Sequence, residues 1–179
     1  MPEEEIKTVM ARPVDCPPAS FKIFINLVMA GGEVPLINLQ RGVPMADMLF
    51  FTGTAGNIMG VGAVRYANTN YHRQLFKMAG VPEMYNPDSV EVCWLYVKPE
   101  ARGTGVWKNA RAARLRYLGE RPSHGVHRTK NDLVSPLITP SGYDQAGEDF
   151  MNNTGDHTIR LVVRNHDLVY NPSKRMRYR

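Results

Sequence analysis

The chain has 179 residues, of which 43% are hydrophobic and 22% charged, values typical of a globular protein. Its longest apolar stretch, residues 21–30, contains Lys22 and Asn26 and is far shorter than the roughly 20 residues that a membrane span needs. The acidic start at residues 2–5 lacks the basic and apolar regions of a secretory signal. We therefore expect one cytoplasmic domain over residues 1–179, with no membrane partner.

Lysine and arginine number 22 against 17 aspartate and glutamate residues, which gives a formal charge of +5. Much of the excess lies at the end of the chain, so we expect a basic tail over residues 170–179. Such an excess suits a nucleic acid, an acidic protein or a phosphate-rich cofactor, and a solvated tail explains it equally well. Cys16 and Cys93 are expected to be free thiols, and no second thiol or histidine stands near enough in sequence to predict a metal site.

The first third of the chain contains two clear turn signals. Residues 1–20 are proline-rich and are expected to be extended. The apolar run 21–30, ended by two glycines, fits either a short helix or a buried strand. Two β-compatible runs at 48–54 and 58–66, separated by Ala-Gly-Asn, predict a hairpin.

The middle of the chain predicts helices and strands in alternation. Two glycines within 58–66, Gly60 and Gly62, indicate a bulge or the close approach of another segment. Residues 71–79 have the pattern of an amphipathic helix, and a glycine and a proline follow it. Residues 90–97 are rich in β-branched and aromatic residues and predict a strand that Pro99 ends.

A glycine loop and a helix follow this strand. Residues 102–105 read Arg-Gly-Thr-Gly, and residues 106–118 are rich in strong helix formers. Further on we expect a strand at 126–130, a helix with Ser135 as its N-cap, and a strand at 158–163. This mixture predicts an α/β (α+β) fold, a single sheet with helices on its faces.

The glycine loop has the composition of a phosphate site. Backbone N–H groups at a helix start bind phosphate, glycines let the backbone approach it, and Arg102 and Lys108 add positive charge. The dinucleotide-binding pattern fails because Lys108 stands at its third glycine, and the P-loop pattern is absent. A plain tight turn is the alternative.

Residues 95–105 (LYVKPEARGTG) resemble the acyl-CoA motif of the GNAT superfamily of N-acyltransferases. Residues 129–143, with Thr-Lys-Asn and then Ser-Gly-Tyr, resemble a later segment of that family, and residues 71–80 resemble a segment of a bacterial branch. The three matches together cover about residues 60–165. The resemblance implies a mixed, mostly antiparallel sheet flanked by helices, and the transfer of an acyl group from acyl-CoA to an amine.

The resemblance also implies which residues hold the cofactor, which is expected to be acetyl-CoA or another acyl-CoA. The loop amides would bind the pyrophosphate, and the backbone of Val97 would hold the thioester carbonyl. The residues expected at the cofactor are Tyr96, Val97, Arg102, Gly103, Thr104, Gly105, Val106, Trp107, Lys108 and Asn131.

Acyl transfer needs a base for the amine and an acid for the leaving thiolate. The family suggests Glu91, six residues before Val97, as the base, and an exposed glutamate at a sheet edge or a structural ion pair is the alternative. Because side chains alternate along a strand, Glu91, Cys93, Leu95 and Val97 are expected on one face.

Two positions depart from the family pattern. Trp107 replaces a small residue, and Ile138 stands where a proton-donating tyrosine is common. Tyr143 and His127 are then the nearest candidates for the acid, although His127 also fits a ring buried in a strand. The alternatives are that solvent supplies the proton or that catalysis is lost.

These departures support a second hypothesis, a catalytically weakened binding module of a phage-type branch that acts on a host protein. The amine acceptor of the enzyme hypothesis is an unidentified small molecule or protein. A homodimer is compatible with the sequence. Nucleic acid is not an expected partner, because the aromatic residues lack interleaved basic ones.

Overall fold

The computed structural model describes residues 4–174. Residues 175–179, with three of the basic residues of the expected tail, lie outside the described residues. The chain forms two units. Unit 1 consists of Met1–Arg65 and Val92–Tyr117, and unit 2 consists of Tyr66–Glu91 and Leu118–Arg179.

Helices and strands mix along the chain as the sequence predicts. The α-helices are α1 (Pro18–Ala30), α2 (Leu36–Gly42), α3 (Thr69–Met78), α4 (Val106–Leu118) and α5 (Ser135–Ile138). The strands are β1 (Lys7–Ala11), β2 (Met48–Thr54), β3 (Asn57–Arg65), β4 (Val90–Val97), β5 (Ser123–Arg128), β6 (Asp144–Gln145), β7 (Phe150–Met151) and β8 (Thr158–Arg164). Strand β4 therefore begins in unit 2 and continues in unit 1.

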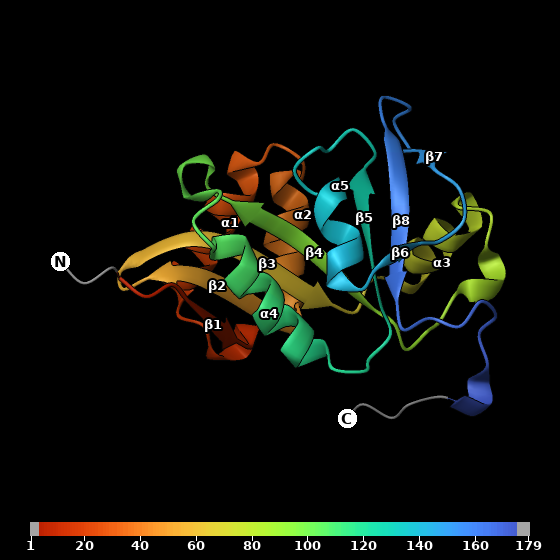
Figure 1. Cartoon of the computed structure of the whole chain (residues 1–179), viewed down its shortest axis with the longest axis horizontal. Coiled ribbons are helices and arrows are strands. Elements are labelled where there is room, and N and C mark those ends of the chain that lie inside the picture. Colours follow the sequence, from red (N-terminus) through yellow and green to blue (C-terminus); the bar gives the residue numbers. More distant parts are fainter. Residues whose placement is uncertain (1–3, 175–179) are drawn as a thin grey trace. The chain divides into compact units, whose positions relative to one another are not determined.

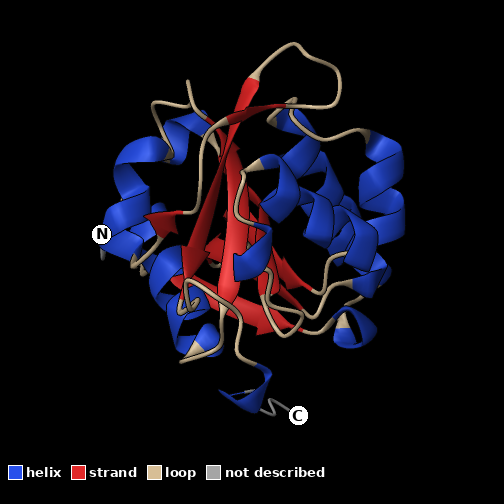
Figure 2. Ribbon diagram, turned by 90° about the vertical axis from the view of Figure 1, so that its right-hand side faces the viewer, coloured by secondary structure: helices blue, strands red, loops and turns tan. Residues whose placement is uncertain are grey.

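The strands form one mixed, mostly antiparallel sheet, in the order β1-β2-β3-β4-β5-β8-β6, with β7 also paired to β8. Strands β4 and β5 are parallel, with Glu91 opposite His124, whereas β8 is antiparallel to β5, β6 and β7. Helices lie on both sides of the strands (Figure 2). The predicted α/β fold is thus confirmed.

The structure decides the ambiguous run at residues 21–30, which is part of helix α1. The helix begins at Pro18, a residue suited to a first helical turn. It buries Phe24 and Val28, four residues apart, on one side. Of the N-terminal segment that was expected to be extended, residues 7–11 form β1, whereas Pro13–Asp15 forms a 3₁₀ helix and the residues from Pro18 onward are α-helical.

Glycines of β3 allow helix α4 to lie against the sheet of unit 1 (Figure 1). A Cβ atom on Gly62 would lie 2.6 Å from Leu95 Cδ2, and one on Gly60 would lie 2.9 Å from Val106 Cγ1. The predicted close approach at these glycines is confirmed. The edge-to-face contact of Phe50 with Tyr117, at 5.8 Å between ring centroids, adds to this packing.

Strand β4 does not alternate regularly, because Trp94 has a φ of +55°. Both Cys93 and Trp94 pack in the core cluster that α1 and α2 form with the sheet, whereas Leu95 packs beside Gly62 on the α4 side. The expectation that Glu91, Cys93, Leu95 and Val97 share one face is therefore wrong. A left-handed residue inserted in the strand reverses the alternation after it, as in a β-bulge.

Two boundaries in unit 2 differ from the sequence predictions. Strand β5 spans Ser123–Arg128 and so begins before residue 126. Ser135 is the first residue of α5 and not its N-cap, which is Val134. The turn before α5 is instead held by Asn131, whose Oδ1 accepts hydrogen bonds from the amides of Leu133 and Val134, both at 3.2 Å.

Sequence patterns gave no separate prediction for β1 and α2. Strand β1 pairs with β2 over five residues, and α2 contributes the fully buried Leu39 to the core of unit 1. Among residues 4–174, none of the helices combines the length and the hydropathy needed to span a bilayer.

Candidate functional site

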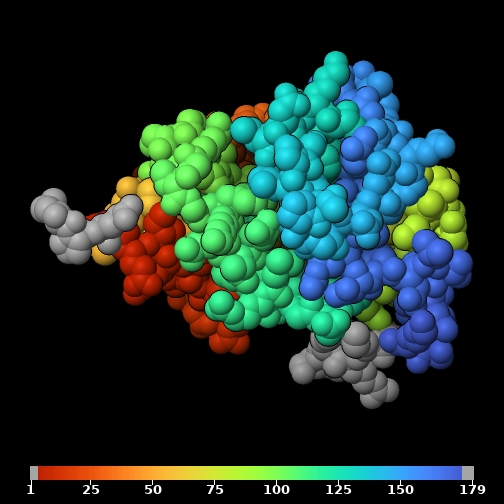
Figure 3. Space-filling model, in the orientation of Figure 1, coloured from red at the N-terminus to blue at the C-terminus, as the bar shows by residue number. Residues whose placement is uncertain are grey.

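The loop between β4 and α4 holds most of the residues that the sequence predicts for the cofactor. Pro99–Ala101 forms a 3₁₀ turn, and the helix starts at Val106. Gly103 and Gly105 have φ angles of +78° and +95°, which favour glycine. In the space-filling view, the green segment that contains this loop lies at the surface (Figure 3).

Free amides line this loop. In the described part of the chain, the N–H groups of Gly103 and Gly105 have no hydrogen-bond partner, and the first amides of α4 have none within the helix. The Thr104 hydroxyl donates to the carbonyl of Ala101 at 2.7 Å and so braces the turn. The side chains of Arg102 and Lys108 are exposed. The loop therefore has the composition and the free donors of an anion site.

Trp107, one of the two residues that depart from the family pattern, packs along its own helix. The guanidinium carbon of Arg114 lies 4.8 Å from the centre of its ring system. Its indole Nε1 is buried and has no hydrogen-bond partner among the described residues. The ring is thus held by a cation–π contact and leaves one buried donor unused.

The last residues of β4 are fixed by close contacts within unit 1. The amide of Lys98 donates to the carbonyl of Met59 at 2.9 Å. The ring of Tyr96 lies against Gly31 at the end of α1, where an added Cβ would be 3.2 Å from Tyr96 Cδ2. Val97 lies on the opposite side, next to Val106 of α4 at the position of Gly60.

Glu91, the predicted base, is a buried carboxylate in unit 2, with 2% of its surface exposed. The hydroxyl of Tyr71 on α3 donates to its Oε1 at 3.0 Å. Glu91 therefore has a neutral donor at one oxygen. The sequence contained Tyr71 in a family-like segment but gave no signal of this contact.

The two candidates for the acid lie elsewhere in unit 2. Tyr143 is buried, and its hydroxyl is 2.7 Å from the hydroxyl of Ser123 at the start of β5. His127, on β5, donates from Nδ1 to the carbonyl of Arg128 at 2.9 Å. A neutral His127 then has its lone pair on Nε2, which is buried without a partner among the described residues.

The structure thus groups the predicted residues by unit. Unit 1 holds the stretch from Tyr96 to Lys108 along one strand end, one loop and one helix start. Unit 2 holds Glu91, His127, Asn131 and Tyr143. Of these, Asn131 serves the turn before α5 through its side chain.

Unit 2 also contains a histidine cluster that the sequence did not reveal. The rings of His72 and His124 are stacked, with centroids 4.1 Å apart and planes inclined by 10°. The hydroxyl of Ser89 lies 2.8 Å from His124 Nδ1 and 2.7 Å from His166 Nε2. These residues come from α3, β5, the segment before β4 and the segment after β8.

The carbonyl of Met84 determines which atoms carry the protons in this series of hydrogen bonds. A carbonyl can only accept, so His166 Nδ1, 3.4 Å from it, carries a hydrogen. The Nε2 atom of a neutral His166 then accepts from Ser89, whose oxygen in turn accepts from Nδ1 of His124. A proton added to Nε2 of His166 would reverse the two hydrogen bonds of Ser89, whereas the hydrogen bond from Nδ1 to the carbonyl of Met84 would remain.

We predict that this cluster lowers the free energy of unfolding in acid. Burial lowers the pKa of His72 and of His166 from 6.5 to about 4, and the charge of His166 further lowers that of His72. Between pH 6.5 and about pH 4 the unfolded chain binds more protons than the folded chain. The contribution of these histidines to stability is therefore fully present above pH 6.5 and is lost as the pH falls toward 4. Between about pH 7 and about pH 5, each of His72 and His166 should lower the free energy of unfolding by about 2 kcal/mol, measured by urea titration.

A matched variant tests the origin of this acid sensitivity. His72→Phe keeps a ring for the stack on His124 but removes one titrating group. The loss of stability between the two pH values should shrink by about half. An unchanged loss in this variant would show that His72 does not contribute.

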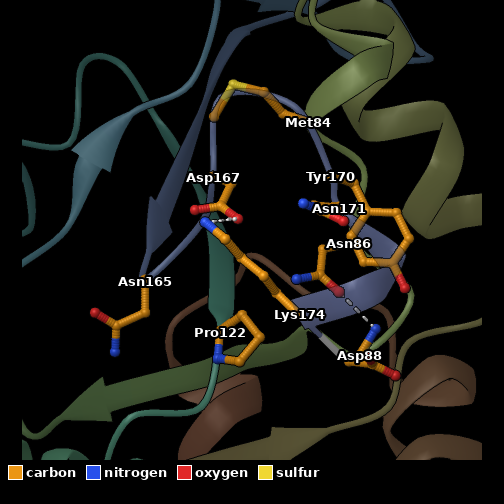
Figure 4. Close-up of a pocket in the computed structure, with 9 residues that line it drawn as sticks. All are labelled: Met84, Asn86, Asp88, Pro122, Asn165, Asp167, Tyr170, Asn171 and Lys174. Atoms are coloured by element: carbon orange, nitrogen blue, oxygen red, sulfur yellow. Dashed lines mark hydrogen bonds and ion pairs between the residues drawn. The ribbon is translucent and has the colours of Figure 1, made fainter. Parts of the chain in front are cut away.

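A pocket of about 160 Å³ lies in unit 2 (Figure 4). Lys174 extends across it and pairs with Asp167 at 3.3 Å. Its lining consists of Met84, Asn86, Asp88, Pro122, Asn165, Asp167, Tyr170, Asn171 and Lys174. None of the site residues predicted from the sequence lines this pocket.

Comparison with known proteins gives similarity in structure only. No family model matches the sequence, and no curated protein is significantly similar to it. An acyl-CoA N-acyltransferase from Pseudomonas aeruginosa is 11% identical, with a TM-score of 0.62 over 89% of this chain and 99% of that chain. The ribosomal-protein-S18-alanine N-acetyltransferase from Escherichia coli is 8% identical, with a TM-score of 0.62 over 94% and 99%.

A third solved structure extends the range of activities among the neighbours. An N-acyl amino acid synthase from uncultured soil microbes is 11% identical, with a TM-score of 0.63 over 90% of this chain and 91% of that chain. The similarities cover most of the chain in each case. The chain therefore has the fold of the GNAT superfamily.

Proposed function

We propose that the chain is an N-acyltransferase that moves an acyl group, acetyl in the first instance, from acyl-CoA to an amine. The observation that carries this proposal is the loop between β4 and α4. It joins two left-handed glycines, free amides and the start of a 13-residue helix, and basic residues stand at both ends. The overall fold of the chain is similar to that of two solved N-acyltransferases, which supports the proposal.

The pyrophosphate of coenzyme A fits the donors of this loop. In our proposal it is bound by the amides of Gly103, Gly105 and Val106, with Arg102 and Lys108 supplying charge. Helix N-termini favour anions through their free N–H groups and the helix dipole. The bound thioester supplies the activated acyl group, and the backbone of Val97 would orient its carbonyl.

Glu91 is proposed to remove the proton of the attacking amine. Its carboxylate is buried and accepts a hydrogen bond from Tyr71, so its position is fixed. Tyr143 and His127 are the candidates to protonate the leaving thiolate. Of these, Tyr143 carries a hydroxyl proton that it can donate, whereas a neutral His127 has no proton on Nε2.

Thermal unfolding with added ligands tests the proposal. A ligand at 100 times its Kd adds about 2.7 kcal/mol to the free energy of unfolding, which should raise the Tm of a chain of this size by roughly 5–10 °C. We expect this shift with acetyl-CoA and with free CoA, and none with oligonucleotides. Release of the CoA thiol in a screen of amines would then identify the acceptor class.

The same experiment separates the alternatives. Stabilisation by CoA without transfer to any amine would support the binding module and contradict the enzyme. Stabilisation by oligonucleotides alone would contradict both. A chain that responds to neither ligand would overturn the assignment of the loop.

A further inference from the structure

The structure points to a second residue in the proton transfer that the proposed function requires. Glu91 has 2% of its surface exposed, whereas Tyr71, which donates to its Oε1 at 3.0 Å, is 38% exposed. Both belong to unit 2. The buried carboxylate is thus connected by one hydrogen bond to a side chain that reaches the surface.

Local structure fixes the position of Tyr71. Asn68 caps helix α3, since its Oδ1 accepts the amides of Asn70 at 3.0 Å and Tyr71 at 3.3 Å. The next residue, His72, stacks on His124, which is the register partner of Glu91 on β5. Two successive residues of α3 therefore contact neighbouring positions of β4 and β5. The phenol is held in place before any acceptor arrives.

We propose that Tyr71 relays the proton of the acceptor amine to Glu91, an inference that rests on the proposed function. A tyrosine hydroxyl can take up a proton near neutral pH only if it gives up its own at the same time. In the step, an N–H bond of the acceptor in its ammonium form breaks and the proton binds Tyr71 Oη. The original hydroxyl proton moves to Glu91 Oε1 along the existing hydrogen bond. The amine becomes nucleophilic, Tyr71 is unchanged and Glu91 is protonated.

Replacement of Tyr71 by phenylalanine tests the relay. Tyr71→Phe keeps the ring and removes the hydroxyl, so kcat should fall by about tenfold to a hundredfold while the KM for acetyl-CoA stays the same. The kcat in mixtures of H₂O and D₂O should depend on the deuterium fraction along a curve in the wild type, because two protons move together. Tyr85→Phe, a tyrosine change in the same unit, is the control and should leave kcat unchanged.

A double variant and a modified tyrosine distinguish the relay from a structural role. Tyr71→Phe combined with Glu91→Gln should be no slower than Glu91→Gln alone, because both act in one step. A fluorinated tyrosine at position 71 keeps the hydroxyl but makes it more acidic, so kcat and its pH profile should shift. A hydroxyl that only supports the fold would give no shift.

The outcomes separate this inference from the proposed function. A Tyr71→Phe variant with wild-type kcat, or with a loss that adds to that of Glu91→Gln, would overturn the relay and leave the enzyme. Absence of transfer by the wild-type protein to every amine would overturn the proposed function, and the relay with it.

Discussion

Gly105→Asp is expected to weaken the binding of coenzyme A by more than about 100-fold, as measured by calorimetry. Gly105 has a φ of +95°, which an aspartate adopts only with strain. The new carboxylate would stand next to the phosphate proposed to bind there, and like charges held in contact cost several kcal/mol. Since each 1.4 kcal/mol changes affinity about tenfold, the two effects together exceed two orders of magnitude.

Two controls separate charge from strain in this prediction. Gly105→Ala has space for its Cβ, because no atom lies within 4 Å, and so reports the backbone strain alone. It should weaken binding much less than the aspartate. Lys174→Ala removes a positive charge that is paired with Asp167 in unit 2 and should leave binding unchanged. Unchanged affinity in Gly105→Asp would refute the site assignment.

The central part of the fold could be predicted because its signals are local. A β-branched run, a proline, two glycines and a run of helix formers follow one another within residues 90–118, and the structure has β4, the loop and α4 in those places. The hairpin of β2 and β3 could be predicted for the same reason, since a short turn separates two apolar runs. Such patterns need no knowledge of distant residues.

Contacts between residues that are distant in the sequence could not be predicted from it. The reversal of β4 at Trp94 depends on the core that receives the indole, where Phe24 lies 6.3 Å away by ring centroid. An alternation rule applied to residues 90–97 alone therefore placed Leu95 on the wrong face. The sequence also did not predict the pairing of the parallel strands β4 and β5, which places His124 opposite Glu91.

The histidine cluster illustrates the same limit in the candidate site. His72, Ser89, His124 and His166 are separated by 17 to 42 residues in the sequence, and each alone has an ordinary role as a core or surface residue. Only the folded chain brings them together. Sequence spacing reveals ligand sets within one element, whereas this set draws one residue from each of four segments.

Glu91→Gln is expected to lower the rate of acyl transfer by about 10²–10⁴-fold, because an amide cannot take the proton of the amine. The glutamine has nearly the same shape, and its oxygen can still accept the hydrogen bond of Tyr71. Affinity for acetyl-CoA should hardly change, since Glu91 is not among the residues proposed to hold the cofactor. Steady-state kinetics together with calorimetry measure the two quantities.

The pH dependence gives this prediction a second readout. In the wild type the rate should fall on the acid side as the base becomes protonated, and this limb should vanish in Glu91→Gln. Glu91→Asp is the matched control, because it keeps a carboxylate but withdraws it by one methylene, so the limb should remain while the rate falls.

If the wild type transfers acyl groups and Glu91→Gln does so equally fast, Glu91 is not the base. The proton acceptor must then be His127 Nε2, or the amine must arrive already deprotonated, and His127→Gln decides between these two cases because only the first predicts a loss of rate.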